Sequence, residues 1–124
     1  PGRRTEVRVY DGRTGAELFA AFPFEAAFTG GVFVAAGDLT GDGEPELVVT
    51  PDQGGGPRVL VYQAWENALA EVASFFGIDD ANFRGGARAA VGDVNGDGAA
   101  DLLVAAGFGG GPRVAGFDGR TVLS

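Results

Sequence analysis

The sequence predicts an all-β fold made of repeated four-stranded units, and three observations lead to this prediction. First, 23 of the 124 residues are glycine and 6 are proline, which indicates many short elements joined by tight turns. Second, long blocks of the chain occur twice. Third, valines alternate with charged residues over residues 6–9, which is the period of a half-buried strand. An apolar content of 45% suffices for a core of one domain.

The repeat is visible when the chain is compared with itself. Residues 28–38 (FTGGVFVAAGD) align with residues 83–93 (FRGGARAAVGD), and GGGPRV occurs at both 54–59 and 109–114. Part of the same unit stands near the N-terminus, where VRVYDG matches VAGFDG further along the chain. We therefore divide the chain into partial outer strands over residues 1–27, repeat one over 28–82 and an incomplete repeat two over 83–124.

Strand-sized runs follow one another in each unit. Strands are predicted over residues 6–10 and 17–22 at the N-terminus, 32–36, 47–50, 58–62 and 71–76 in repeat one, and 87–91, 102–105 and 113–117 in repeat two. The runs at 34–37 and 89–92 contain only small apolar residues. We expect these two strands to be covered on both faces and to lie innermost.

Residues 65–76 admit two interpretations. Trp65, Leu69, Val72 and Phe76 recur at helical spacing, which fits an amphipathic helix. The alignment of residues 71–76 with residues 17–22 instead predicts an outer strand preceded by an inserted turn. We prefer the strand, because a repeat is stronger evidence than one short window.

An acidic, glycine-containing loop joins the first two predicted strands of each repeat. The loops read DLTGDGEPE and DVNGDGAAD. Side-chain oxygens at the first, third and fifth positions, a carbonyl at the seventh and a carboxylate at the ninth form the oxygen-rich shell that Ca²⁺ prefers, and glycine at the sixth permits the sharp turn. The predicted calcium ligands are Asp38, Thr40, Asp42, the Glu44 carbonyl and Glu46 in one loop, and Asp93, Asn95, Asp97, the Ala99 carbonyl and Asp101 in the other.

An EF-hand and a metal-free turn both fit these loops less well than a calcium site of another kind. An EF-hand would carry a carboxylate at the twelfth position, which here holds Val49 or Val104. Metal-free Asx turns would also use Asp, Asn and Gly, but the recurrence of the loop in identical register favours calcium, and two Ca²⁺ ions would halve the net charge of −8. Because Asn95 offers an amide oxygen where Thr40 offers a hydroxyl, and because Pro45 stiffens the first loop, we expect the second loop to bind more tightly.

These loops, the Gly-Gly before each inner strand and the FGGGP run at 108–112 resemble the FG-GAP/VCBS repeats of integrin α-chains and many bacterial surface proteins. The resemblance implies β-propeller blades, about two four-stranded antiparallel blades in this chain, with calcium in the loop between the first two strands of each. By resemblance the second loop fits the ligand pattern fully, whereas the first departs from it at Thr40 and Glu46. A propeller closes with roughly four to eight blades, so we expect self-association into a closed ring, or a place in a longer chain.

The expected function is a calcium-binding structural and protein-interaction scaffold, secreted or on a cell surface and bacterial in origin, because extracellular calcium fills even weak sites. The alternative is a carbohydrate-binding, lectin-like propeller with Trp65 and Tyr62 as a stacking platform. Simple packing of Trp65 accounts for its presence more plainly.

Nucleic-acid binding, membrane insertion and catalysis are disfavoured. The net charge of −8 argues against nucleic acid as a partner, and no run of about 20 apolar residues predicts a membrane span. The chain has no His and no Cys. Since loop carboxylates such as Asp52, Asp79 and Asp80 are ordinarily solvated turn residues, we expect no enzymatic activity.

Overall fold

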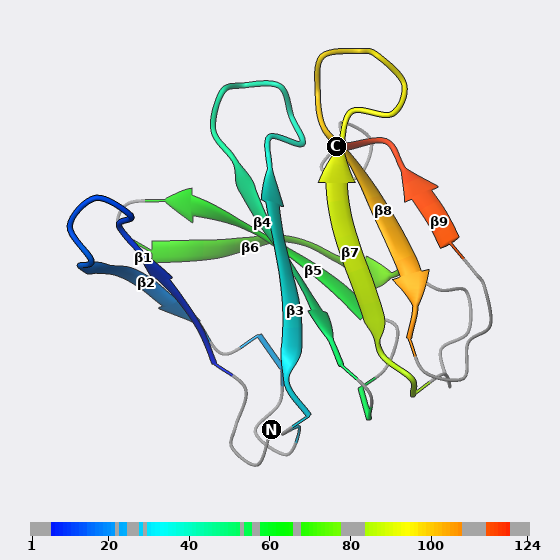
Figure 1. Cartoon of the computed structure of the whole chain (residues 1–124), viewed down its shortest axis with the longest axis horizontal. Helices are drawn as coiled ribbons and strands as arrows, with labels where there is room; N and C mark the ends of the chain where they lie inside the picture. Colours follow the sequence, from blue (N-terminus) through cyan, green and yellow to red (C-terminus); the bar gives the residue numbers. More distant parts are fainter. Residues whose placement is uncertain are drawn as a thin grey trace.

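The computed structural model describes residues 6–21, 23–24, 28, 30–52, 54–55, 58–65, 68–77, 84–107 and 114–119. Over these residues its regular elements are nine strands in three antiparallel sheets (Figure 1). In chain order they are β1 (Val7–Tyr10), β2 (Glu17–Ala21), β3 (Val32–Gly37), β4 (Glu46–Pro51), β5 (Arg58–Trp65), β6 (Ala68–Phe76), β7 (Ala87–Gly92), β8 (Asp101–Ala106) and β9 (Val114–Phe117). The all-β prediction is confirmed. No helix in the described ranges could cross a membrane.

The order of the strands follows the repeat. A four-stranded sheet has the order β3-β4-β5-β6, a three-stranded sheet has the order β7-β8-β9, and β1 pairs with β2. All nine strands lie where the sequence predicts them, with ends that differ by a few residues. Two predicted end residues, Phe22 and Arg113, lie outside the described residues.

The helical interpretation of residues 65–76 is wrong, and the strand interpretation is confirmed. β5 and β6 form one long hairpin in which Trp65 pairs with Ala68, so residues assigned to an inserted turn belong to the strands. The register shifts where Tyr62 pairs with Glu71 and its neighbour Val61 pairs with Ala73. Val72 is therefore the extra residue of a bulge, and this interruption of the alternation explains why the window has no clean period of two.

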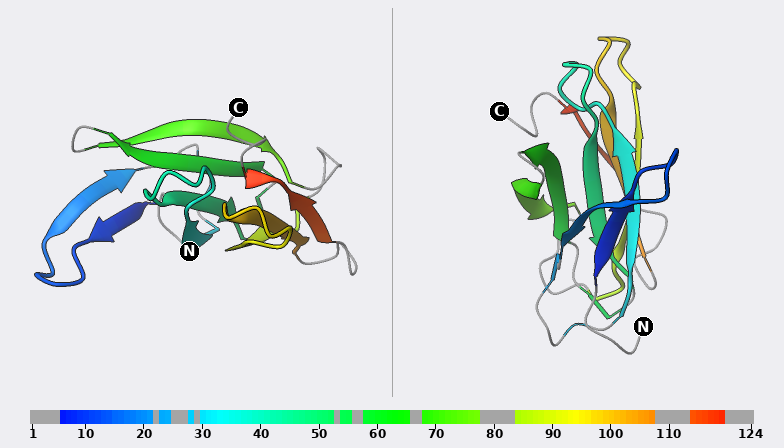
Figure 2. Two further views of the ribbon diagram at one scale, coloured as in Figure 1. Left: turned by 90° about the horizontal axis from the view of Figure 1, so that it is seen from above. Right: turned by 90° about the vertical axis from the view of Figure 1, so that its left-hand side faces the viewer.

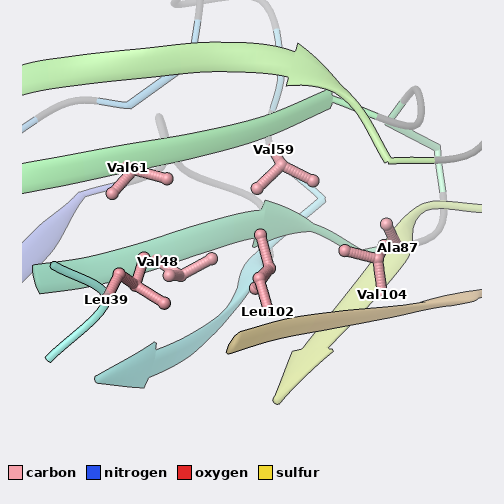
Figure 3. Close-up of a cluster of buried hydrophobic side chains, with 7 residues drawn as sticks. All are labelled: Leu39, Val48, Val59, Val61, Ala87, Leu102 and Val104. Carbon is pink, nitrogen blue, oxygen red and sulfur yellow. The ribbon is translucent and has the colours of Figure 1, made fainter. Parts of the chain in front are cut away.

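Consecutive residues of β4 and β5 face two different cores, as the pleat of a strand requires. Val48, Val59 and Val61 join residues of β7, β8 and the first acidic loop in one cluster, whose members are Leu39, Val48, Val59, Val61, Ala87, Leu102 and Val104 (Figure 3). Val49 and Leu60 face the opposite way. They pack in a second cluster, whose members are Val7, Phe24, Val49, Leu60 and Tyr62.

The four-stranded sheet thus lies between the β1–β2 hairpin and the three-stranded sheet (Figures 1 and 2). Each fully buried valine contributes about 1.5–3 kcal/mol, so both neighbours stabilise the central sheet. This is the arrangement expected of repeats that bury their faces against adjacent units.

The expectation that the small-residue strands are covered on both faces is wrong. β3 and β7 are edge strands of their sheets, and Val34 of β3 is 55% exposed. The strands buried on both faces are β4 and, over residues 59–62, β5. The small residues have another cause: β3 packs against β7, and a β-carbon added to Gly37 would collide with Val91.

Candidate metal centres

The two acidic loops project from the same end of adjacent sheets (Figure 1). Each closes a hairpin in identical register, with Gly37 paired to Glu46 in one and Gly92 paired to Asp101 in the other. The loops also touch, since the Ala100 amide donates to the Asp38 carbonyl at 2.8 Å. The internal repeat therefore places two equivalent candidate sites side by side.

The first acid of each loop organises the backbone around it. Asp38 Oδ1 accepts the amides of Gly41 and Asp42 at 2.7 and 3.2 Å, and its Oδ2 accepts the amide of Gly43 at 2.7 Å. Gly41 and Gly43 have φ of 83° and 88°, a region in which other residues are strained. The glycines thus let the loop fold its amides inward onto the carboxylate.

The second loop repeats these contacts. Asp93 Oδ1 accepts the Gly96 amide at 2.8 Å and Oδ2 accepts the Gly98 amide at 3.1 Å, with both glycines again at positive φ. The fifth acids behave alike in both loops, because Asp42 accepts the Glu44 amide at 2.8 Å and Asp97 accepts the Ala99 amide at 3.0 Å.

The ninth acids are buried at the base of the loops. Glu46 is 1% exposed and accepts the Leu39 amide at 2.7 Å, and Asp101 is 2% exposed and accepts the Val94 amide at 3.0 Å. Each therefore ties the end of its loop to the beginning. A carboxylate oxygen has more than one lone pair, so an amide hydrogen bond leaves it able to bind a cation.

Three carboxylates converge in each loop. Ligand atoms of Asp38, Asp42 and Glu46 all lie within 4.8 Å of one another, and those of Asp93, Asp97 and Asp101 do the same. These are hard oxygen donors of the kind that Ca²⁺ binds in flexible loops. The residues present fit a calcium ion at both positions.

The third positions are less alike. Thr40 Oγ1 donates to Asp38 Oδ1 at 3.3 Å, whereas Asn95 Oδ1 accepts the Asp97 amide at 3.2 Å. At the seventh positions, Glu44 has an exposed side chain and Ala99 is 1% exposed. The residue type at the seventh position can therefore vary, as expected where the backbone carbonyl is the predicted ligand.

Opposite pKa shifts occur within the first site. The amide hydrogen bond from Gly43, reinforced by those from Gly41 and Asp42, lowers the pKa of Asp38. Burial raises the pKa of Glu46, and the charges of Asp42 and Asp38 raise it further. In the second loop the Gly98 amide lowers the pKa of Asp93. A cation in the first loop would offset the cost of ionised Glu46.

The structure adds residues that the motif does not contain. Gln63 Nε2 donates to Glu46 Oε2 at 3.3 Å. In the second loop, Asn95 Nδ2 donates to Asp118 Oδ2 at 3.2 Å and the Gly119 amide donates to Asp101 Oδ1 at 3.1 Å. The repeat alignment contains a signal for them, since Gln63 aligns with Asp118, although Gln63 lies within β5 and Asp118 directly follows β9.

Of the residues in the lectin alternative, Tyr62 does not lie at these loops. Tyr62 is 7% exposed within the second core cluster, so its ring is not available as a stacking platform. The Trp65 side chain, Asp79 and Asp80 lie outside the described residues.

An open cavity of about 530 Å³ lies between β6 and β9. Phe75 and Phe117, whose rings meet edge to face with centroids 5.0 Å apart, contribute to its lining together with Asp118. Tyr62 is not among the described lining residues. The cavity therefore does not bring together the aromatic pair that the lectin alternative uses.

Comparison with known families agrees with this geometry. The FG-GAP-like repeat matches residues 38–104, more than half of the chain. No curated protein matches this chain. The matched region starts at the first acid of the first loop, ends within β8 and contains both acidic clusters. The chain therefore belongs to the FG-GAP-like repeat family.

Proposed function

We propose that this chain is a calcium-binding module of β-propeller architecture that serves as a structural and protein-interaction scaffold. One observation carries the proposal. Two clusters of three carboxylates occur at the same position of two repeated hairpins, and within each cluster the ligand atoms lie within 4.8 Å of one another. A solitary acidic turn is common without metal. Two matched clusters, each with one buried acid among its three carboxylates, argue that both bind the same kind of ligand.

The repulsion within each cluster supports a cation. Two unit charges about 4 Å apart repel by about 1 kcal/mol in water and about 4 kcal/mol near a protein surface. Calcium would be held by the three carboxylates of each cluster, by Thr40 or Asn95, and by the carbonyl of Glu44 or Ala99. It would supply a cross-link between the two ends of each loop and no chemical step.

A binding role also suits the way in which the acids are used. The first, fifth and ninth acids all accept backbone amides of their own loops, so the protein uses them to shape the loops. We propose no catalytic activity. A secreted or cell-surface setting fits, because calcium there reaches the millimolar range in which extracellular modules bind it.

Self-association is the second part of the proposal. Strands β1 and β2 form an antiparallel hairpin, as β5 and β6 do. The β1–β2 hairpin covers one face of the central sheet. Within the described residues, the three-stranded sheet has a neighbour on one face. Further copies of the chain, or further units of a longer chain, would cover its other face and continue the ring.

Calorimetric titration of the chain with Ca²⁺ tests the calcium proposal. We expect two binding events, and occupancy at 100 times the dissociation constant would stabilise the fold by about 2.7 kcal/mol per site. Asp101→Asn should remove one event and Glu46→Gln the other.

Asp11→Asn is the matched control, because Asp11 forms a similar turn with the amides of Arg13 and Thr14 and belongs to neither carboxylate cluster. Absence of both heat and thermal stabilisation at millimolar calcium would refute the proposal.

A further inference from the structure

We infer, on the basis of the calcium-binding function proposed above, that Asp118 is a positioning residue of the second loop. Its carboxylate holds the Asn95 side chain so that the amide oxygen, and not the amide nitrogen, faces the cation. Asp118 follows β9 and is not part of the loop motif. The inference adds a residue from the outer part of the sheet to the control of a site that lies between β7 and β8.

The hydrogen bonds of Asn95 support this role. Its Nδ2 donates to Asp118 Oδ2 at 3.2 Å, and its Oδ1 accepts the Asp97 amide at 3.2 Å. An amide nitrogen carries two hydrogens and cannot bind a metal ion, so an Asn ligand works in one of its two flipped orientations. Asp118 accepts hydrogen bonds but cannot donate them when ionised, and it therefore selects the orientation in which Oδ1 points back into the loop.

Asp118 acts from outside the ligand set. It is exposed, and it does not belong to the group of Asp93, Asp97 and Asp101 whose ligand atoms lie within 4.8 Å of one another. Supporting contacts of this kind orient the residues that touch the metal. The neighbouring Gly119 amide donates a hydrogen bond to Asp101 Oδ1 at 3.1 Å. The segment after β9 therefore contacts the second loop at its third and ninth positions.

The first loop lacks this arrangement. Gln63 occupies the position equivalent to Asp118, but it donates to Glu46 and not to the third residue of the loop. Thr40 instead donates its hydroxyl hydrogen to Asp38 within the loop. The structure thus adds a physical reason for expecting tighter binding at the second loop, where the third ligand is held by a group outside the loop.

The test is a calcium titration of the full chain in an Asp42→Asn/Glu46→Gln background. These two substitutions remove calcium binding at the first loop and change the side-chain shapes little. Asp118→Ala should weaken calcium binding by about 10-fold, in the range found for supporting residues. Asp118→Asn keeps a carbonyl acceptor for Asn95 and should stay within about 3-fold of the background protein. Asp11→Ala is the control, because Asp11 occupies the equivalent repeat position in the β1–β2 segment.

Two further readouts separate positioning from general stability. In an Asn95→Thr background, Asp118→Ala should have no effect on affinity, because the group that it positions is gone. With Tb³⁺ in the site, the luminescence lifetimes in H₂O and D₂O should report about one additional bound water in Asp118→Ala, since the Asn95 oxygen leaves the shell.

An unchanged affinity in Asp118→Ala, an equal loss in Asp118→Asn, or an undiminished effect in the Asn95→Thr background would each overturn the inference while leaving calcium binding intact. Absence of calcium binding in the background protein, together with absence of binding in the unmodified chain, would overturn the proposed function and the inference with it.

Discussion

Among single residues, Glu46 shows most clearly how the loop motif and the core constrain each other. Its side chain is 1% exposed, yet it is a carboxylate that lies within 4.8 Å of two others. Hydrogen bonds from Leu39 and Gln63 account for its two oxygens. They do not remove the cost of burying a charge, which a cation would offset.

Glu46→Gln should stabilise the calcium-free protein at pH 7 by a few degrees in melting temperature while abolishing calcium binding at the first loop. Gln keeps the shape, and the Gln63 amide can flip to accept from it. The folded-state pKa of Glu46 is raised, so the stability associated with the neutral carboxyl is present at low pH and is lost as the pH rises through that pKa. The advantage of Gln should therefore shrink as the pH is lowered toward 4.5.

Thermal melts of calcium-stripped protein between about pH 5 and 7 check this prediction. Glu44→Gln is the matched control, because it makes the same chemical change at an exposed side chain of the same loop. A melting temperature for Glu46→Gln at or below that of the unmodified protein throughout this pH range would contradict the prediction.

Thr50 presents the opposite case, a polar group in the core. It is 0% exposed, and its Oγ1 has no hydrogen-bond partner among the described residues. Thr50→Val should therefore raise the free energy of unfolding by about 1 kcal/mol, because it removes a desolvated hydroxyl without changing the branching of the side chain. Urea denaturation measures the change.

Thr14→Val is the control for Thr50→Val. The Thr14 hydroxyl accepts the Ala16 amide, so its loss should bring no stabilisation. Equal or greater stabilisation at Thr14 would show that the effect at Thr50 comes from added hydrophobicity and not from the buried hydroxyl.

Among elements, the acidic loops depend on the segment that follows β9. Gly119 illustrates this dependence, because a β-carbon there would collide with the carbonyl of Ala100 and the backbone of Leu39. Those residues come from the second and the first acidic loop. The segment after β9 thus packs directly on the place where the two loops meet.

Gly119→Ala should lower the free energy of unfolding by about 1–3 kcal/mol, because backbone cannot move aside as a flexible side chain can. It should also weaken calcium binding at the second loop by displacing the Gly119 amide from Asp101. Gly12→Ala is the matched control, since Gly12 occupies the same repeat position and a β-carbon there meets no atom within 4 Å. Equal stability of the two variants in urea would refute the packing argument.

For the whole molecule, stability comes from contacts between sheets. The cluster shared by both repeats joins them through apolar side chains, and Arg88 of β7 lies over the Phe33 ring of β3 at 5.0 Å from its centroid. The central sheet has neighbours on both faces. A propeller extends this pattern around a ring, so a further neighbour for the three-stranded sheet is the natural continuation.

Light scattering with excess calcium should give a mass of several chains, and the mass should fall after chelation, because the carboxylates of adjacent loops then repel one another. An Asp101→Asn/Glu46→Gln variant in excess calcium should behave as the chelated protein does. A monomer with the same mass in both conditions would exclude self-association and leave the longer-chain arrangement.

Much of the fold could be predicted because the same physical pattern occurs twice. Alternation and the repeat locate the strands, and the two acidic clusters follow from the spacing of Asp, Gly and Asp in each loop. The region of β5 and β6 is harder to interpret, because the bulge at Val72 disturbs the alternation on which the prediction depends. The repeat resolves it, since the β1–β2 and β5–β6 hairpins occur at the same place in the repeated unit.

The sequence by itself determined the all-β architecture, the strand order within each unit and the acids that converge in each loop, because these depend on local spacing and on the recurrence of a unit. Only the tertiary structure decided which strands are buried on both faces, that Tyr62 is a core residue, and that Gln63, Asp118 and Gly119 support the loops. Those features arise where segments distant in the chain meet. Their contacts depend on how one sheet packs on the next, and a pattern confined to one segment carries no record of that packing.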